Sequence, residues 1–120
     1  MRRSPETLPI VIRIPLETVS LSNQREHWAK RSRRAKDHRR AAYMWTQRIA
    51  RVDLPLTVTL TRIAPRKLDD DNLRGALKSV RDGVADRLGI DDNDLRVSWM
   101  YGQKAGNVGE KAVEVWVDAA

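Results

Sequence analysis

Two short acidic segments hold the residues of this chain that are best suited to chemistry. Asp69-Asp70-Asp71 precedes a predicted helix, and Asp91-Asp92 follows it. Adjacent carboxylates repel one another, so such runs need an offsetting interaction. Capping of a helix start or formation of a turn would use some of these acids. An oxygen-rich cluster also binds Mg²⁺, which bridges to phosphate oxygens and activates water. All three explanations are open at this point.

The helix between the two acidic segments, predicted over residues 71–88, has two contrasting faces. At 100° per residue, one face is apolar and belongs in a core. The opposite face presents Asp71, Gly75, Lys78 and Asp82. Gly75 leaves a gap between charged side chains, which suits close approach of a ligand backbone. The simpler alternative is a solvated face with an i,i+4 ion pair. If the strands flanking this helix are neighbours, we expect the two acidic segments to converge.

The segment from Arg25 to Arg40 is strongly basic. Residues 1–50 carry 12 basic and 4 acidic side chains, and this segment alone has eight bases in 16 residues. The bases are Arg25, Lys30, Arg31, Arg33, Arg34, Lys36, Arg39 and Arg40. Duplex phosphates would neutralise so dense a run and release counterions. We therefore expect nucleic-acid binding here, with a solvated helix face as the alternative. Trp28 either stacks on a base or packs in the core.

The elements that must position these groups follow from hydrophobic periodicity. Alternating or β-branched runs predict four strands, at 10–14, 56–63, 95–101 and 113–117. Residues 27–50 favour helix, either as one helix or as a loop followed by a shorter helix. Three glycines in 102–109 indicate a hairpin loop or a mobile flap. The order β-α-β-α-β-β predicts an α/β (α+β) fold, with a small mixed four-stranded sheet and two main helices on one face.

Length and composition exclude several classes of protein. The 120 residues predict a single domain spanning 1–120. The chain has no cysteine, which excludes disulfides and thiolate metal sites. The two histidines, His27 and His38, do not have the spacing of a zinc hydrolase. Because no apolar run could span a bilayer and no signal peptide follows Met1, we expect a cytoplasmic protein with no membrane partner. We also expect no organic cofactor.

The acidic motifs resemble those of the RusA-type Holliday-junction resolvases, a family often carried by prophages. The likeness covers about residues 56–117 and rests on two motifs joined by a helix, Asp69-x-Asp71-Asn72-Leu73 and Asp91-Asp92. The resemblance implies a homodimeric, Mg²⁺-dependent endonuclease that cuts four-way DNA junctions in a bacterial or phage-infected cell. Mn²⁺ is an alternative ion.

The resemblance also implies roles for individual acids. Asp69, Asp71 and Asp92 match the family's essential carboxylates, and Asp91 is the adjacent acid that would share the metal. These residues place the expected metal site within 69–92. More loosely, Asn23 and the segment beginning at His27 match the family's Asn and Trp-bearing basic region.

One position departs from the family pattern. The family lysine three residues after the motif's Asn is Gly75 in this chain. Lys78 lies about one turn further along the same helix face and is expected to supply the catalytic cation, with Arg74 as the other candidate. The expected function is therefore that of a crossover junction endodeoxyribonuclease in DNA recombination and repair. The alternative is a non-catalytic nucleic-acid-binding module whose acids are only caps and turns.

Overall fold

The computed structural model describes residues 7–19 and 27–120, and these residues form one mixed sheet and two long helices. In chain order the elements are β1 (Ile10–Ile14), α1 (Trp28–Trp45), the 3₁₀ helix η1 (Gln47–Ile49), β2 (Leu56–Ala64), α2 (Asp70–Leu88), β3 (Val97–Ala105) and β4 (Ala112–Ala119). The α+β fold, the four-stranded mixed sheet and the order β-α-β-α-β-β predicted from the sequence are confirmed.

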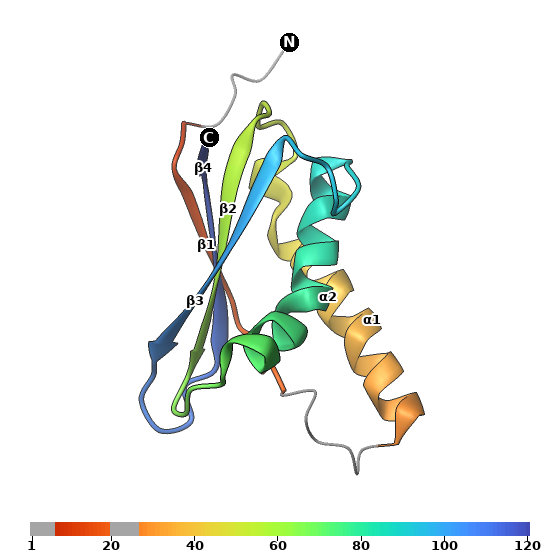
Figure 1. Ribbon diagram of the computed structural model, residues 1–120, viewed down its shortest axis with the longest axis vertical. Helices are drawn as coiled ribbons and strands as arrows, with labels where there is room; N and C mark the ends of the chain where they lie inside the picture. Colours follow the sequence, from red (N-terminus) through yellow and green to blue (C-terminus); the bar gives the residue numbers. More distant parts are fainter. Residues whose placement is uncertain (1–6, 20–26) are drawn as a thin grey trace.

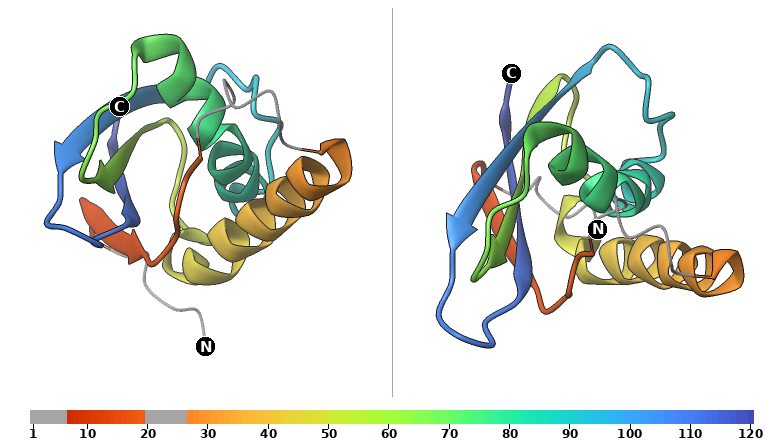
Figure 2. Two further views of the ribbon diagram at one scale, coloured as in Figure 1. Left: turned by 90° about the horizontal axis from the view of Figure 1, so that it is seen from below. Right: turned by 60° about the horizontal axis from the view of Figure 1, so that its bottom comes forward.

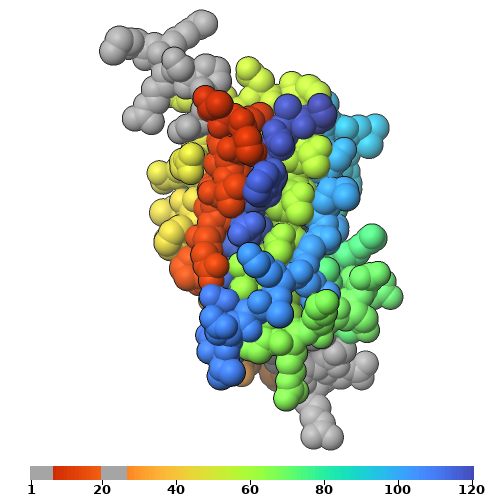
Figure 3. Space-filling view, turned by 90° about the vertical axis from the view of Figure 1, so that its left-hand side faces the viewer, coloured from red at the N-terminus to blue at the C-terminus, as the bar shows by residue number. Residues whose placement is uncertain are grey.

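The sheet has the strand order β1-β4-β2-β3. β2 and β3 are parallel, whereas β1 with β4 and β4 with β2 are antiparallel. Parallel neighbours need a crossover connection, and α2 supplies it. Both long helices lie on one face of the sheet (Figures 1 and 2). On the opposite face the four strands lie side by side at the molecular surface (Figure 3).

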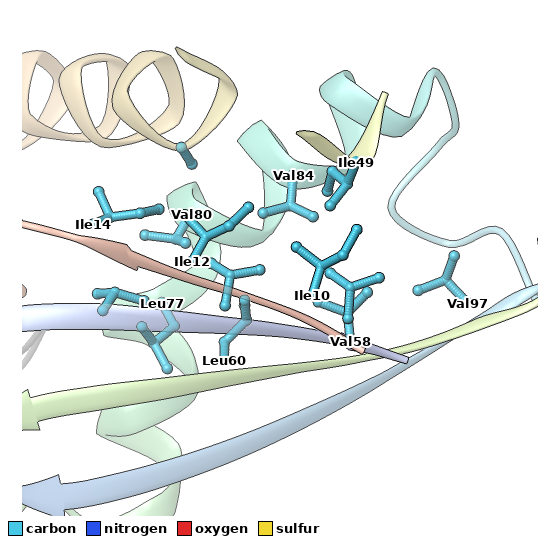
Figure 4. Close-up of a cluster of buried hydrophobic side chains, with 14 of the residues drawn as sticks. Ile10, Ile12, Ile14, Ile49, Val58, Leu60, Leu77, Val80, Val84 and Val97 are labelled. Atoms are coloured by element: carbon cyan, nitrogen blue, oxygen red, sulfur yellow. The ribbon is translucent and has the colours of Figure 1, made fainter. Parts of the chain in front are cut away.

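The core lies between the sheet and the helices. Side chains alternate along a strand, so Leu56, Val58 and Leu60 of β2 share the face that the helices cover. They belong to one buried cluster with Leu77 and Val80 of α2 (Figure 4). Full burial of each such side chain stabilises the fold by about 1.5–3 kcal/mol. This apolar contact fixes α2, and therefore the acidic segments at its two ends, against the sheet.

The two helices also contact one another directly. The Arg39 guanidinium of α1 binds the Asp86 carboxylate of α2 through two hydrogen bonds, of 2.6 and 2.8 Å. At the crossing, Gly83 lies so close to α1 that a Cβ there would overlap the Arg39 carbonyl oxygen and lie 2.7 Å from the Ala42 Cβ. Further along, Arg87 donates to the Tyr43 carbonyl oxygen. Charged side chains of both helices therefore join α1 to α2.

Several predicted boundaries differ from the structure, and those of α1 and β3 differ most. The helix expected over 27–50 ends at Trp45, where the Thr46 hydroxyl donates to the Ala42 carbonyl oxygen at 2.6 Å, and η1 follows. β3 begins at Val97 rather than at residue 95. It also continues into the predicted glycine loop as far as Ala105, with Gly102 paired to Thr61 of β2. A Cβ on Gly102 would lie 3.3 Å from the Thr61 hydroxyl, so glycine suits this strand position.

Within the described residues, neither α1 nor α2 has the apolar length that crossing a bilayer requires.

Candidate functional site

The first acidic segment caps α2. Asp69 is the N-cap residue, and its Oδ1 accepts a hydrogen bond of 2.9 Å from the Asn72 N–H. Asp70 and Asp71 occupy the first helical turn, where the helix dipole favours negative charge. The helix thus begins one residue earlier than predicted. Capping accounts for Asp69, while Asp71 is exposed and has no hydrogen-bond or ion-pair partner within the described residues.

The second acidic segment forms the turn after α2. Asp91 Oδ1 accepts from the Asn93 N–H at 2.9 Å, and this hydrogen bond lowers the pKa of Asp91. Asp94 accepts from both the side chain and the backbone of Arg96, which lowers its pKa to about 2. The turn explanation therefore accounts for Asp91 and Asp94. Asp92 differs, because its half-buried side chain lines a groove beside α2.

The expected convergence of the two acidic segments is not found. β2 and β3 are neighbours as the prediction required, but they are parallel. The residues that follow β2 and those that precede β3 therefore lie at opposite ends of the sheet (Figure 1). Ten residues, about 15 Å along the helix axis, separate Asp71 from Arg81, whose Nη2 binds the Asp92 carbonyl oxygen. No three Asp, Glu or His side chains of the described chain gather closely enough to hold a metal ion.

The chemistry of the acidic side chains fits Mg²⁺, but their arrangement does not. Carboxylate oxygens such as those of Asp69, Asp71, Asp91 and Asp92 are the ligands that this ion prefers. Their arrangement in the described chain does not fit a single metal centre, because the pairs occupy opposite ends of α2. The structure therefore gives no basis for a reaction step through the ion.

A groove between α2 and the turn at 90–94 gathers charged side chains from both. Its residues, called the α2 groove below, are Arg74, Gly75, Lys78, Arg81, Asp92, Asn93 and Tyr101. The cavity measures about 380 Å³. Lys78 and Asp92 also line a second cavity of about 300 Å³ with Asp82 and Asp86. Lys78 pairs with Asp82 at 3.4 Å, which is the i,i+4 ion pair of the solvated-face alternative. Both candidate cations, Lys78 and Arg74, thus line the same groove as Gly75.

Arg81 positions the turn against α2, and sequence reasoning missed it. Its Nη2 donates to the Asp92 carbonyl oxygen at 2.6 Å, and its Nη1 donates to the Tyr101 hydroxyl at 2.9 Å. The guanidinium also lies 4.8 Å from the centre of the Trp99 ring, a cation–π distance. The sequence contained a signal for this contact. An arginine borders the apolar stripe of α2, and two aromatic residues alternate along β3.

The basic segment forms the surface of α1. Within this helix only His38 and Ala42 are buried. The exposed bases are Lys30, Arg31, Arg33, Lys36, Arg39 and Arg40, and Arg34 is half-buried. Asp86 already binds Arg39. Arg31 and Arg34 line a small cavity with Gly75, so the basic helix borders the α2 groove. Arg25 and Asn23 lie outside the described residues.

Three of the four tryptophans are too exposed to be core residues. Trp28 is 71% exposed at the start of α1, stacked obliquely beside His27, so it is not a core residue. Trp45 and Trp116 are also exposed, whereas Trp99 is partly buried against Arg81. The surface position of Trp28 excludes the core alternative, and base stacking stays a prediction.

Comparisons with known proteins give little functional information. No family model matches the chain. A protein of Xylella fastidiosa (strain Temecula1), described as uncharacterized, is 37% identical over 91 residues, which is 66% of this chain and 58% of that protein. The chain thus spans less than two thirds of this relative. A crystal structure of 2C-methyl-D-erythritol 2,4-cyclodiphosphate synthase from Plasmodium vivax aligns with 70% of this chain and 52% of that one, at 21% identity and a TM-score of 0.31.

Proposed function

We propose that this chain is a DNA endonuclease of the RusA type, which cuts four-way junctions as a homodimer and requires Mg²⁺ or Mn²⁺. The observation that carries the proposal is the α2 groove, which Arg74, Lys78 and Arg81 line together with Asp92. A groove of this composition suits a DNA phosphate, because its cations can stabilise negative charge on the phosphate. The requirement for a divalent ion rests on the resemblance of the Asp69-x-Asp71-Asn72-Leu73 motif.

Phosphate binding is divided between the helices. Lys78 and Arg74 in the groove stabilise negative charge that develops on the phosphate under attack. The exposed bases of α1 hold the DNA arms by neutralising backbone phosphates. Lys78 substitutes for the family lysine, because it lines the groove one turn beyond Gly75.

A non-catalytic DNA-binding module is the second candidate function. One observation favours it: the described carboxylates do not gather into a metal centre. In that case Asp69 would only cap α2, Asp91 would only shape the turn, and the bases of α1 would be the functional residues.

The deciding experiment incubates an end-labelled four-way junction, and a matched linear duplex, with Mg²⁺, Mn²⁺ or EDTA. We expect paired symmetric nicks in the junction alone, and only with a divalent ion. The motif resemblance implies that Asp71 binds the divalent ion, so Asp71→Asn is expected to abolish cleavage. Junction binding should persist, or tighten because one negative charge is removed. Asp53→Asn makes the same change at an exposed loop position and is expected to cleave normally.

Three other outcomes would be informative. Tight junction binding without cleavage in any divalent ion would establish the binding module. Cleavage by Asp71→Asn at the wild-type rate would remove Asp71 from the site. If light scattering gives the mass of one chain while cleavage is intact, the protein does not act as a homodimer.

A further inference from the structure

A second cationic site lies at the far end of β2, outside the α2 groove. The alternation that places Leu56, Val58 and Leu60 toward the helices places Arg62 on the same face. Arg62 pairs across the sheet with the fully buried Val113 and is itself only 8% exposed. An arginine thus stands where the core pattern calls for an apolar residue.

The buried guanidinium of Arg62 has no carboxylate partner within the described chain. Its Nε donates to the Thr18 hydroxyl at 2.9 Å, and its Nη1 donates to the Arg66 carbonyl oxygen. Of the five N–H donors of an arginine, these contacts use two. Burial lowers the pKa of Arg62 from its ordinary value. A buried charge without a counter-ion is costly, so proteins rarely keep one unless an anion neutralises it.

Arg62 lines a cavity of about 260 Å³ at this end of the sheet. At about 30 Å³ for each water molecule, the space holds roughly nine waters and therefore admits a phosphate group. Arg66 and Lys111 also line the cavity, together with a single carboxylate, Glu17. Lys111 binds Glu17 at 2.7 Å and lowers its pKa. That pair is neutral, which leaves the charges of Arg62 and Arg66 without compensation in the cavity.

We propose that this cavity binds a phosphate group, with Arg62 as a fixed donor at its base and Arg66 and Lys111 at its rim. Arg62 is held in place by Thr18 and the Arg66 carbonyl, so its remaining N–H groups are pre-organised for an anion. Arginine recognises phosphate well because its planar fork makes paired hydrogen bonds. The ligand is a phosphate monoester or diester, either in a polynucleotide or on a free phosphorylated molecule.

The test titrates the intact protein with inorganic phosphate, against chloride at equal ionic strength, and follows the arginine Nε–H signals by NMR. We expect a saturable shift of the Arg62 signal with a dissociation constant of about 1 mM. Arg66→Gln and Lys111→Gln alter exposed side chains, so the fold should persist. Each is expected to weaken phosphate binding about tenfold, Arg66→Gln by removing a cation and Lys111→Gln by leaving the Glu17 carboxylate uncompensated in the cavity. Arg51→Gln, the same loss of charge at an exposed site outside the cavity, should leave it unchanged.

Two results would overturn the proposal: no saturable shift of the Arg62 signal, or equal weakening by Arg51→Gln, which would indicate a response to net charge alone. A parallel titration with duplex DNA identifies the source of the phosphate. Weaker DNA binding by Arg66→Gln, with a salt slope lower by about one, indicates a polynucleotide. Unchanged DNA binding indicates a free phosphorylated molecule. Neither readout uses cleavage, so the proposal stands or fails independently of the nuclease.

Discussion

At the scale of single residues, Trp28 is a large apolar side chain that the fold does not use. It is 71% exposed at the start of the basic helix α1. Stacking of a base on an aromatic ring contributes about 1–3 kcal/mol. We therefore expect Trp28→Ala to weaken junction binding about tenfold, as measured by fluorescence anisotropy. Trp45→Ala removes an exposed tryptophan from the other end of α1 and should have little effect. Equal losses in the two variants would contradict a stacking role.

His38 is the residue whose titration should affect stability near neutral pH. It is buried in α1, and burial, with the nearby Arg34 charge, lowers its pKa from 6.5, while Asp37 acts in the opposite direction. The unfolded chain therefore binds a proton at this histidine before the folded chain does. His38 thus lowers the free energy of unfolding as the pH falls below 6.5, and has no such effect above it.

Urea denaturation across this pH range measures the effect. We expect His38→Gln to show a flatter dependence of stability on pH between about 7 and 5.5 than the wild-type protein. An identical slope in both proteins would show that another group causes the pH dependence.

At the scale of secondary-structure elements, the crossing of α1 and α2 depends on Gly83. A methyl group there would overlap the Arg39 carbonyl oxygen, which belongs to the backbone and cannot move aside cheaply. We expect Gly83→Ala to lower the free energy of unfolding by about 3 kcal/mol. Gly89→Ala is the comparison, because a Cβ at Gly89 would contact nothing. This variant loses stability only because alanine disfavours the positive φ of 71° at that position. That loss is about 1 kcal/mol, so the reverse order of the two losses in urea denaturation would contradict the packing argument.

Patterns within single elements predicted those elements well. The alternation of Leu56, Val58 and Leu60 indicated β2, and Gly89 marked the end of α2 correctly. Arg62 continues the same alternation, yet a charged residue in a core-facing position was not recognised from sequence. Whether such an arginine is buried depends on Thr18 and the Arg66 carbonyl, which only the folded chain brings to it.

Relations between elements were harder to predict. Periodicity contains no information on which strands pair, or in which direction. The parallel pairing of β2 with β3 determines that Asp71 and Asp92 lie far apart along α2. It also places the Asp92 turn beside Lys78. The α2 groove could not be predicted from the sequence, because it depends on this contact between elements. The local chemistry of the acids was thus predictable, whereas their convergence was not.

At the scale of the whole molecule, the distribution of charge makes a prediction about salt. The chain carries a net charge of +7, and exposed bases of α1 contribute strongly to it. We expect Arg33→Ala with Lys36→Ala to weaken DNA binding and to reduce the slope of log affinity against log salt by about two. Fluorescence anisotropy at several salt concentrations measures this slope.

Arg96→Ala is the control for that experiment, because Asp94 already binds Arg96 and the residue lies outside α1. It should leave the slope unchanged. If the double variant also keeps the wild-type slope, these two bases do not contact phosphate.

The strand order also governs how the sheet can form during synthesis on the ribosome. β4 lies between β1 and β2, yet it is the last of the four strands to be translated. Until residues 112–119 emerge, β1 has no neighbour in the sheet, and one edge of β2 is open. Open edges are templates for pairing with other chains. The nascent chain is therefore expected to pass through an aggregation-prone stage that ends when β4 inserts between β1 and β2.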